Sequence, residues 1–136
     1  MLKDFCCITC GKSFQSYGER IFCSVKCQNH KRYLDYIELW KNGKEDGMRG
    51  KTATSHHIRN YLFEKHNNSC SECGWSQKNP FTNKIPLELE HVDGDFMNNK
   101  EENLKLLCPN CHSLTATWKG ANKKQGRPRA KYYRGT

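Results

Sequence analysis

Apolar residues recur at helical spacing in two segments of the first half of the chain. In residues 31–42 they are Tyr33, Leu34, Ile37 and Trp40, and in residues 56–66 they are Ile58, Tyr61 and Leu62. Each set falls on one face of a helix, with a core contact as the expected role of Trp40. Gly43 can end the first helix, and Ser55 can cap the start of the second. The Gly-rich, charged residues 43–54 predict a linker or loop.

Alternation replaces helical spacing in the second half of the chain. Residues 87–92 read L-E-L-E-H-V, which predicts a strand with leucines on one face and glutamates on the other. Asp93 opens a polar loop, and residues 104–108 predict a second short strand. Pro109 fits the first turn of a closing helix over 109–118. Two helices followed by strand, loop, strand and helix predict a small α+β fold.

The cysteine content compensates for a small apolar core. Only 35% of the 136 residues are hydrophobic, but nine are cysteine. Small domains with little core often rely on metal or disulfide crosslinks. The first residues lack the apolar stretch of a signal peptide, and no run is long enough to span a membrane. We therefore expect a reduced, cytoplasmic protein (in the host cytoplasm if it is phage-encoded), with zinc rather than disulfides.

Eight of the nine cysteines form two sets with the spacing of zinc ligands. The sets are Cys7, Cys10, Cys23 and Cys27, and Cys70, Cys73, Cys108 and Cys111. Each set predicts a structural zinc site with four thiolate ligands. In the first set, Cys6 in place of Cys7, His30 as a ligand, and free thiols are alternatives. In the second set, 34 residues separate the two pairs, so zinc would clip a folded unit together.

Charge is distributed unevenly along this chain of formal net charge +9. Residues 1–54 carry +4, residues 55–118 carry −2, and residues 119–136 carry +7. An acidic centre suits a bound cation, and basic flanks suit a nucleic-acid backbone. The predicted DNA-binding residues of the tail are Lys119, Lys123, Lys124, Arg127, Arg129, Lys131 and Arg134. The G-R-P-R run within it resembles an AT-hook core, although a plain basic tail is the preferred interpretation.

Several motifs between residues 70 and 112 follow a recognisable order. A C-x-x-C pair precedes Glu90 and His91, and N-L-K-L-L-C then runs from Asn103 into C-P-N-C-H, which ends at His112. In these motifs the chain resembles the HNH endonucleases in their four-cysteine, zinc-containing form. The resemblance implies a ββα-metal fold for the catalytic module. The preceding I-E-L-W-K-N-G stretch also resembles segments of small phage or mobile-element nucleases.

The resemblance implies roles for four residues. His91 would be the general base that deprotonates water, which suits a side chain that titrates near neutrality. Asn103 would fix the orientation of His91. Glu90 and His112 would hold one divalent ion, Mg²⁺ or Mn²⁺, as a Lewis acid on the scissile phosphate. The products would carry 5′-phosphate and 3′-hydroxyl ends.

Some features allow other interpretations. The family more often has Asp or His at the position of Glu90, so Asp93 or Asp95 could share its ligand role. His112 could instead be an idle neighbour of the zinc site. The letters C-P-N-C-H also fit a c-type haem attachment, which would require export and would leave the first C-x-x-C pair unexplained.

These features divide the chain into four parts. They are a zinc knuckle (1–30), a helix with a Gly-rich linker (31–54), an HNH module (55–118) and a basic DNA-binding tail (119–136). Together they predict a metal-dependent endonuclease that hydrolyses phosphodiester bonds in double-stranded DNA. A non-catalytic, zinc-dependent DNA-binding protein is the alternative from another class, and an RNA-directed nuclease would share the same residues. The sequence leaves open whether the protein is a monomer or a homodimer, and whether it acts in homing, restriction or packaging. No membrane partner is expected.

Overall fold

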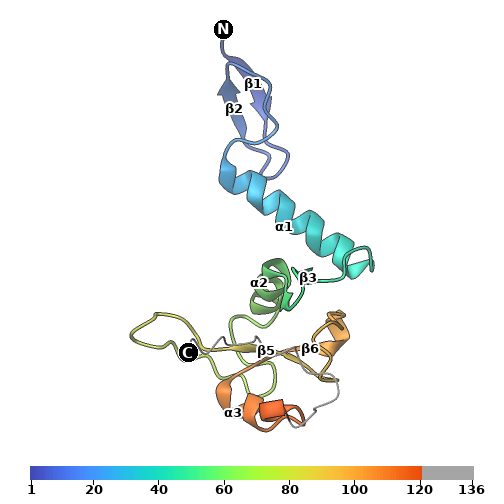
Figure 1. The fold of residues 1–136 in the computed structure, drawn as a ribbon. Coiled ribbons are helices and arrows are strands. Elements are labelled where there is room, and N and C mark those ends of the chain that lie inside the picture. The colour runs from blue at the N-terminus through green and yellow to red at the C-terminus, as the bar shows by residue number, and fades with distance from the viewer. Residues whose placement is uncertain (121–136) are drawn as a thin grey trace, which may run out of the picture.

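A computed structural model of the chain describes residues 1–120. It shows helices together with three separate two-stranded antiparallel sheets, which confirms the α+β class. Figure 1 shows an elongated arrangement, in which the first sheet lies at one end, the last sheet lies at the other, and the longest helix runs between them. No helix in residues 1–120 is both long and apolar enough to cross a membrane.

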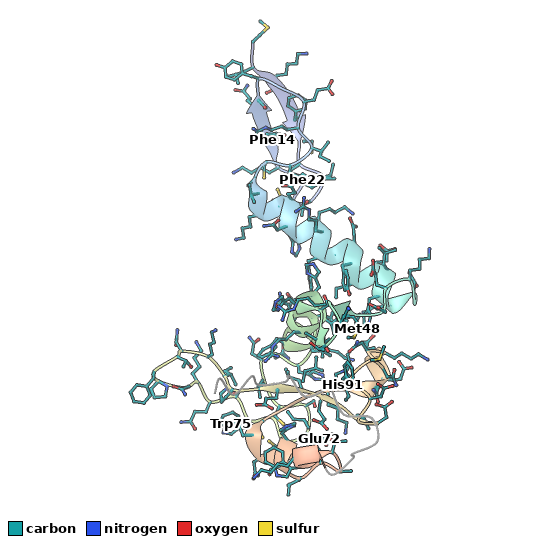
Figure 2. The ribbon with its side chains drawn as sticks, viewed as in Figure 1. Phe14, Phe22, Met48, Glu72, Trp75 and His91 are labelled. Carbon is teal, nitrogen blue, oxygen red and sulfur yellow. The ribbon has the colours of Figure 1, made fainter. Side chains whose placement is uncertain are left out.

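The N-terminal end is a β-hairpin with an aromatic pair. β1 (Lys3–Cys6) and β2 (Ser13–Ser16) pair antiparallel, with Phe5 directly opposite Phe14. The centroids of these two rings are 5.9 Å apart. Figure 2 shows Phe14 and Phe22 at this end of the molecule, far from the last sheet. Cross-strand aromatic contacts of this kind stabilise a hairpin that has few other apolar residues.

The first long helix, α1 (Val25–Lys41), begins earlier than its apolar spacing predicts. Ser24 caps it by accepting a hydrogen bond from the Cys27 N–H, so the helix starts six residues before the predicted residue 31. The predicted start was therefore wrong, because the cap and not the apolar stripe sets it. The predicted end is confirmed, since Gly43 has φ +73° and its N–H donates to the Trp40 carbonyl at 3.0 Å.

The predicted linker contains a short hairpin. β3 (Met48–Arg49) pairs with β4 (Ala53–Thr54). Gly47, just before β3, has φ +77°, and its carbonyl accepts a hydrogen bond from the Ser55 N–H at 2.7 Å. A Cβ atom at Gly47 would lie only 2.6 Å from the Cβ of Asn99, so the glycine lets the linker backbone press against a loop much later in the chain.

The second helix, α2 (His56–Lys65), matches its prediction closely. Ser55 caps it by accepting a hydrogen bond from the His57 N–H. The helix packs against α1 and the last sheet through a buried apolar cluster of Ile37, Trp40, Ile58, Leu62 and Leu104. The predicted core role of Trp40 is confirmed, because only 5% of its surface is exposed.

The last sheet is formed by β5 (Glu88–His91) and β6 (Leu104–Leu107), which pair antiparallel. The register sets Glu90 opposite Lys105 and His91 opposite Leu104. A 3-10 turn, η1 (Glu101–Asn103), precedes β6. Two of the predicted zinc ligands pack with leucines in a second buried cluster. Its members are Cys70, Leu87, Leu106, Leu107 and Cys108.

The closing helix is shorter than predicted. α3 (Pro109–Ser113) starts with a proline, as expected, but is followed by an irregular turn and the 3-10 segment η2 (Trp118–Gly120). The predicted extension to residue 118 was wrong. The Thr115 hydroxyl donates to the His112 carbonyl at 2.9 Å, and such side-chain bonds to the backbone compete with helix propagation.

Candidate active site and metal centres

Both predicted cysteine sets come together in the fold. Within each set, the four sulfur atoms lie within 4.8 Å of one another. The Cys10 and Cys23 sulfurs are 3.7 Å apart, those of Cys23 and Cys27 are 3.5 Å apart, and those of Cys73 and Cys108 are 3.7 Å apart. A tetrahedral zinc ion with Zn–S bonds of about 2.3 Å requires sulfur separations of about 3.8 Å. The geometry of both clusters therefore fits zinc.

The two clusters share one local structure. Each C-x-x-C pair is followed by a glycine with positive φ, namely Gly11 at +73° and Gly74 at +77°. In both turns the glycine N–H donates to the carbonyl of the first cysteine, at 2.8 and 2.9 Å. The alternative ligands Cys6 and His30 lie outside the cluster that contains Cys7. Cys6 is exposed, and its thiol contacts the Gly11 carbonyl instead.

The electrostatics of the second cluster also suit a cation. Burial raises the pKa of Cys70, but the backbone N–H groups of Cys73 and Cys108 outweigh burial and bring that pKa to about 6. Hydrogen bonding with Cys73 and Cys108 raises the pKa of Cys111 to about 12. A first thiolate forms readily here, whereas further thiolates need a positive charge among them. Zinc provides that charge, because thiolates are its ligands.

A shallow cleft of about 280 Å³ beside this cluster collects three of the predicted catalytic residues, Glu90, His91 and His112. Side chains alternate along a strand, so Glu90 faces α3 and His91 faces the opposite side of the sheet. His91 is the last residue of β5 and still reaches the cleft. Both residues are buried, with 7% of each exposed. Figure 2 shows His91 near Met48, where the linker hairpin meets the last sheet.

His112 on α3 faces two carboxylates of β5. Its Nδ1 atom lies 3.0 Å from Glu90 Oε2, and its Nε2 atom lies 3.2 Å from Glu88 Oε2. Nδ1 is buried, yet it lacks the alignment of a hydrogen bond to any partner in residues 1–120. Neighbouring ligand atoms of an octahedral ion with bonds of 2.0–2.1 Å are about 3 Å apart, so Glu90 and His112 have the spacing of a ligand pair. Thr117 donates a hydrogen bond to the other oxygen of Glu90.

The ring of His91 is held by Asn99, a loop residue to which the sequence assigned no role. His91 Nε2 lies 2.8 Å from Asn99 Oδ1. The Asn99 amide is oriented by its own partners, since Nδ2 donates to the Asp46 carbonyl at 3.3 Å and Oδ1 accepts from the Thr54 hydroxyl at 3.1 Å. An amide oxygen can only accept, so Nε2 of His91 carries the proton and Nδ1 is left as the basic nitrogen. The Trp40 indole donates to the Asn99 carbonyl at 2.7 Å and fixes the backbone as well.

Asn103 shapes the loop that follows His91. Its Nδ2 donates to Asp93 Oδ1 at 2.9 Å and to the Asn98 carbonyl at 2.8 Å, and its Oδ1 accepts from the Asp93 N–H at 3.1 Å. Of the hydrogen bonds within residues 1–120, none joins the Asn103 side chain to the His91 ring. The Asn98 amide lowers the pKa of Asp93. Asp95 accepts from the Met97 N–H, so both loop aspartates are engaged within the loop.

Two further findings concern residues at the edge of the site. Glu88, which the sequence placed on the same face as Glu90, was overlooked as a neighbour of His112. Among the predicted tail residues, Lys119 is described, and its Nζ lies 5.5 Å from the centroid of the Trp118 ring. The remaining tail predictions fall outside the described residues, namely Lys123, Lys124, Arg127, Arg129, Lys131 and Arg134.

The described structure defines a small α+β protein with two four-cysteine clusters and a glutamate–histidine cleft beside the second. These features lie in the motifs that resemble the HNH endonucleases, and a curated relative confirms the resemblance. The chain is similar to the H-N-H endonuclease F-TflIV of Escherichia phage T5, with 39% identity over 92 residues. The matched part covers 64% of this chain and 38% of the relative, so the chain spans well under half of that protein. No protein-family model matches the chain, and no solved structure matches it.

Proposed function

We propose that the chain is a metal-dependent DNA endonuclease of the HNH type. One observation carries the proposal, namely that Glu90, His91 and His112 line a single cleft, with the two predicted metal ligands 3.0 Å apart. The similarity to a phage H-N-H endonuclease is an independent observation that supports nuclease activity. In this proposal β5, β6 and α3 are the ββα-metal unit.

Glu90 and His112 would hold the divalent ion. The carboxylate oxygen of Glu90 suits Mg²⁺ or Mn²⁺, with the imidazole of His112 as the second donor at this spacing, whereas the four-thiolate clusters suit zinc. When bound, the ion supplies Lewis-acid stabilisation of the charge that develops on the phosphate and the leaving oxygen. The Thr117 hydroxyl keeps one Glu90 oxygen engaged and thereby directs the other oxygen toward His112.

His91 would act as the general base. Its Nδ1 accepts a proton from water, while Nε2 keeps its own proton and donates it in the hydrogen bond to Asn99 Oδ1. The water oxygen then bonds to phosphorus, the bond from phosphorus to the 3′-oxygen breaks, and that oxygen takes up a proton. The products have 5′-phosphate and 3′-hydroxyl ends. Asn103 contributes by holding the loop after His91, through its bonds to Asp93 and Asn98.

The remaining parts of the chain would support this chemistry. The first cysteine cluster makes residues 1–30 a zinc knuckle, and the second clips the start of the nuclease module (55–118) to α3. Residues 31–54 connect them, and α1 runs continuously from one to the other. The basic tail (119–136) would bind double-stranded DNA.

Replacement of His91 tests the assignment. We expect His91→Ala to abolish cleavage of a labelled DNA duplex in Mg²⁺ or Mn²⁺ while zinc content and DNA binding remain. His30→Ala is the matched control, because His30 is an exposed histidine on α1 that does not line the cleft. Full activity of His91→Ala would refute the base assignment. Tight binding by every protein, with no cleavage by the wild type, would favour the non-catalytic DNA-binding alternative.

A further inference from the structure

A second hollow adjoins the cleft and has a different chemistry. It measures about 490 Å³ and is lined by Arg49 from β3, by His56 and Arg59 from α2, and by Glu88 and Leu89 from β5. Glu88 and Leu89 also line the cleft that contains His91 and His112. The two hollows therefore share one wall, the outer part of β5. We call the hollow lined by Arg49, His56 and Arg59 the basic hollow.

Within residues 1–120, the two arginines of the basic hollow form no ion pair; Glu88, the carboxylate that lines the hollow, lies against His112 instead. Arg49 and Arg59 are exposed, and neither has a carboxylate partner within residues 1–120. Elsewhere in this part of the chain lysines do pair with acids, as Lys31–Asp35, Lys65–Glu101 and Lys105–Glu72. The two guanidinium groups are therefore available to an anion from outside.

Both arginines also keep spare donors. Arg49 donates to the Nε2 atom of His56, and one Nη of Arg59 donates to the Leu87 carbonyl at 3.2 Å. A guanidinium carries five N–H donors, so several remain on each side chain. His56 is the first residue of α2, whose N-terminal end adds a partial positive charge. Planar donors of this kind match the paired oxygens of a phosphate.

We infer that the basic hollow binds a backbone phosphate of the DNA strand that lies in the adjacent cleft. The inference rests on the proposed endonuclease function and adds to it a DNA contact within the folded part of the chain. The shared wall of Glu88 and Leu89 places the bound phosphate next to the position of the scissile one. Beyond Arg59 the surface continues into a hollow of about 750 Å³ lined in part by Lys78 and Lys84, which gives the strand a basic path away from the cleft.

The salt dependence of DNA binding tests this inference. Binding of the full-length, zinc-loaded protein to a DNA duplex would be measured over a range of KCl concentrations in the His91→Ala background, so that the DNA stays intact. The slope of log K against log salt is negative, and each lost phosphate contact reduces its magnitude by about 0.9. We expect the double variant Arg49→Gln, Arg59→Gln to show that reduction, because both arginines bind the same phosphate, and each single variant to show a measurable part of it. Arg49→Lys should keep the wild-type slope because it keeps the charge.

Arg32→Gln is the matched control, because Arg32 is an exposed arginine on α1, away from both hollows. It should leave the slope unchanged. Wild-type slopes for Arg49→Gln and Arg59→Gln, with normal zinc content, would overturn the inference. If Arg59→Gln misfolds, Arg49→Gln on the exposed hairpin decides. DNA cleavage by the wild type is measured separately. If the wild type cleaves DNA but the slopes of the variants are unchanged, phosphate binding in the basic hollow is refuted and the endonuclease proposal stands. If the slopes are reduced but the wild type does not cleave DNA, the endonuclease proposal is refuted and phosphate binding stands.

Discussion

The Asn99 side chain connects the linker hairpin to His91, the proposed general base. Its truncation to alanine should therefore lower both the stability of the fold and the rate of cleavage. The side chain is 3% exposed and makes hydrogen bonds with His91, Thr54 and the Asp46 carbonyl. Asn99→Ala deletes all three bonds and leaves the buried ring of His91 without this partner. The backbone bond from the Trp40 indole to the Asn99 carbonyl is retained, so the loop keeps one anchor.

The loss of stability follows from those bonds. A neutral hydrogen bond contributes about 0.5–1.5 kcal/mol net, so three of them amount to about 3 kcal/mol. Domains of this size are stable by about 5–15 kcal/mol, so the variant should remain folded at room temperature. The variant should also lose catalytic rate, because the His91 ring is no longer oriented by Asn99. Loss of a group that orients a metal-binding histidine typically lowers activity by about ten- to a hundredfold, and we expect a loss of the same order for the base His91.

Urea unfolding and cleavage kinetics would be measured on the same preparations. Asn98→Ala is the matched control, because within residues 1–120 the Asn98 side chain bonds to Asp93 alone and its loss should cost about 1 kcal/mol. We expect Asn99→Ala to lower kcat with little change in KM, and to alter the pH profile of kcat, whereas Asn98→Ala should not. Equal losses in the two variants, or a destabilised Asn99→Ala with the wild-type kcat, would refute the positioning role of Asn99.

Two other perturbations test the metal clusters and the pH dependence of the fold. Cys70→Ser should remove one of two zinc ions per chain, measured by atomic absorption, and lower Tm, whereas Cys6→Ser should retain both ions; equal zinc contents would contradict the assignment. Burial raises the pKa of Glu101, but hydrogen bonds from Lys65 and Tyr61 outweigh burial and hold the pKa below its ordinary 4.5. The stabilisation is therefore present above pH 4.5 and is lost as pH falls through the lowered pKa. Glu101→Gln should destabilise the protein to urea more at pH 7 than at pH 4, and equal effects at both pH values would contradict this linkage.

Features specified by nearby residues were predictable from the sequence. The C-x-x-C-G turns and α2 with its Ser55 cap depend on residues a few positions apart. The alternation of β5 was visible for the same reason. The cysteine spacing even predicted a contact across a long loop, because zinc chemistry requires four thiolates at one point.

Features specified by long-range contacts were not predictable. The role of Asn99 depends on Trp40, Asp46, Thr54 and His91 meeting around one amide, and only a pair of consecutive asparagines in a polar loop marked the position in the sequence. The β3–β4 hairpin was hidden in a Gly-rich segment because its strands are two residues each. The basic hollow likewise requires β3, α2 and β5 to be brought together.

The most direct test of the proposed function is cleavage of supercoiled plasmid DNA by the zinc-loaded protein. Reactions with Mg²⁺ or Mn²⁺ would be compared with reactions without added divalent ion and with His91→Ala. The proposal predicts open-circular or linear product only when the active protein and a divalent ion are both present, and the form of the product separates nicking from double-strand cleavage. Intact plasmid under every metal condition, together with clear band shifts on DNA that carries varied sequences, would contradict it.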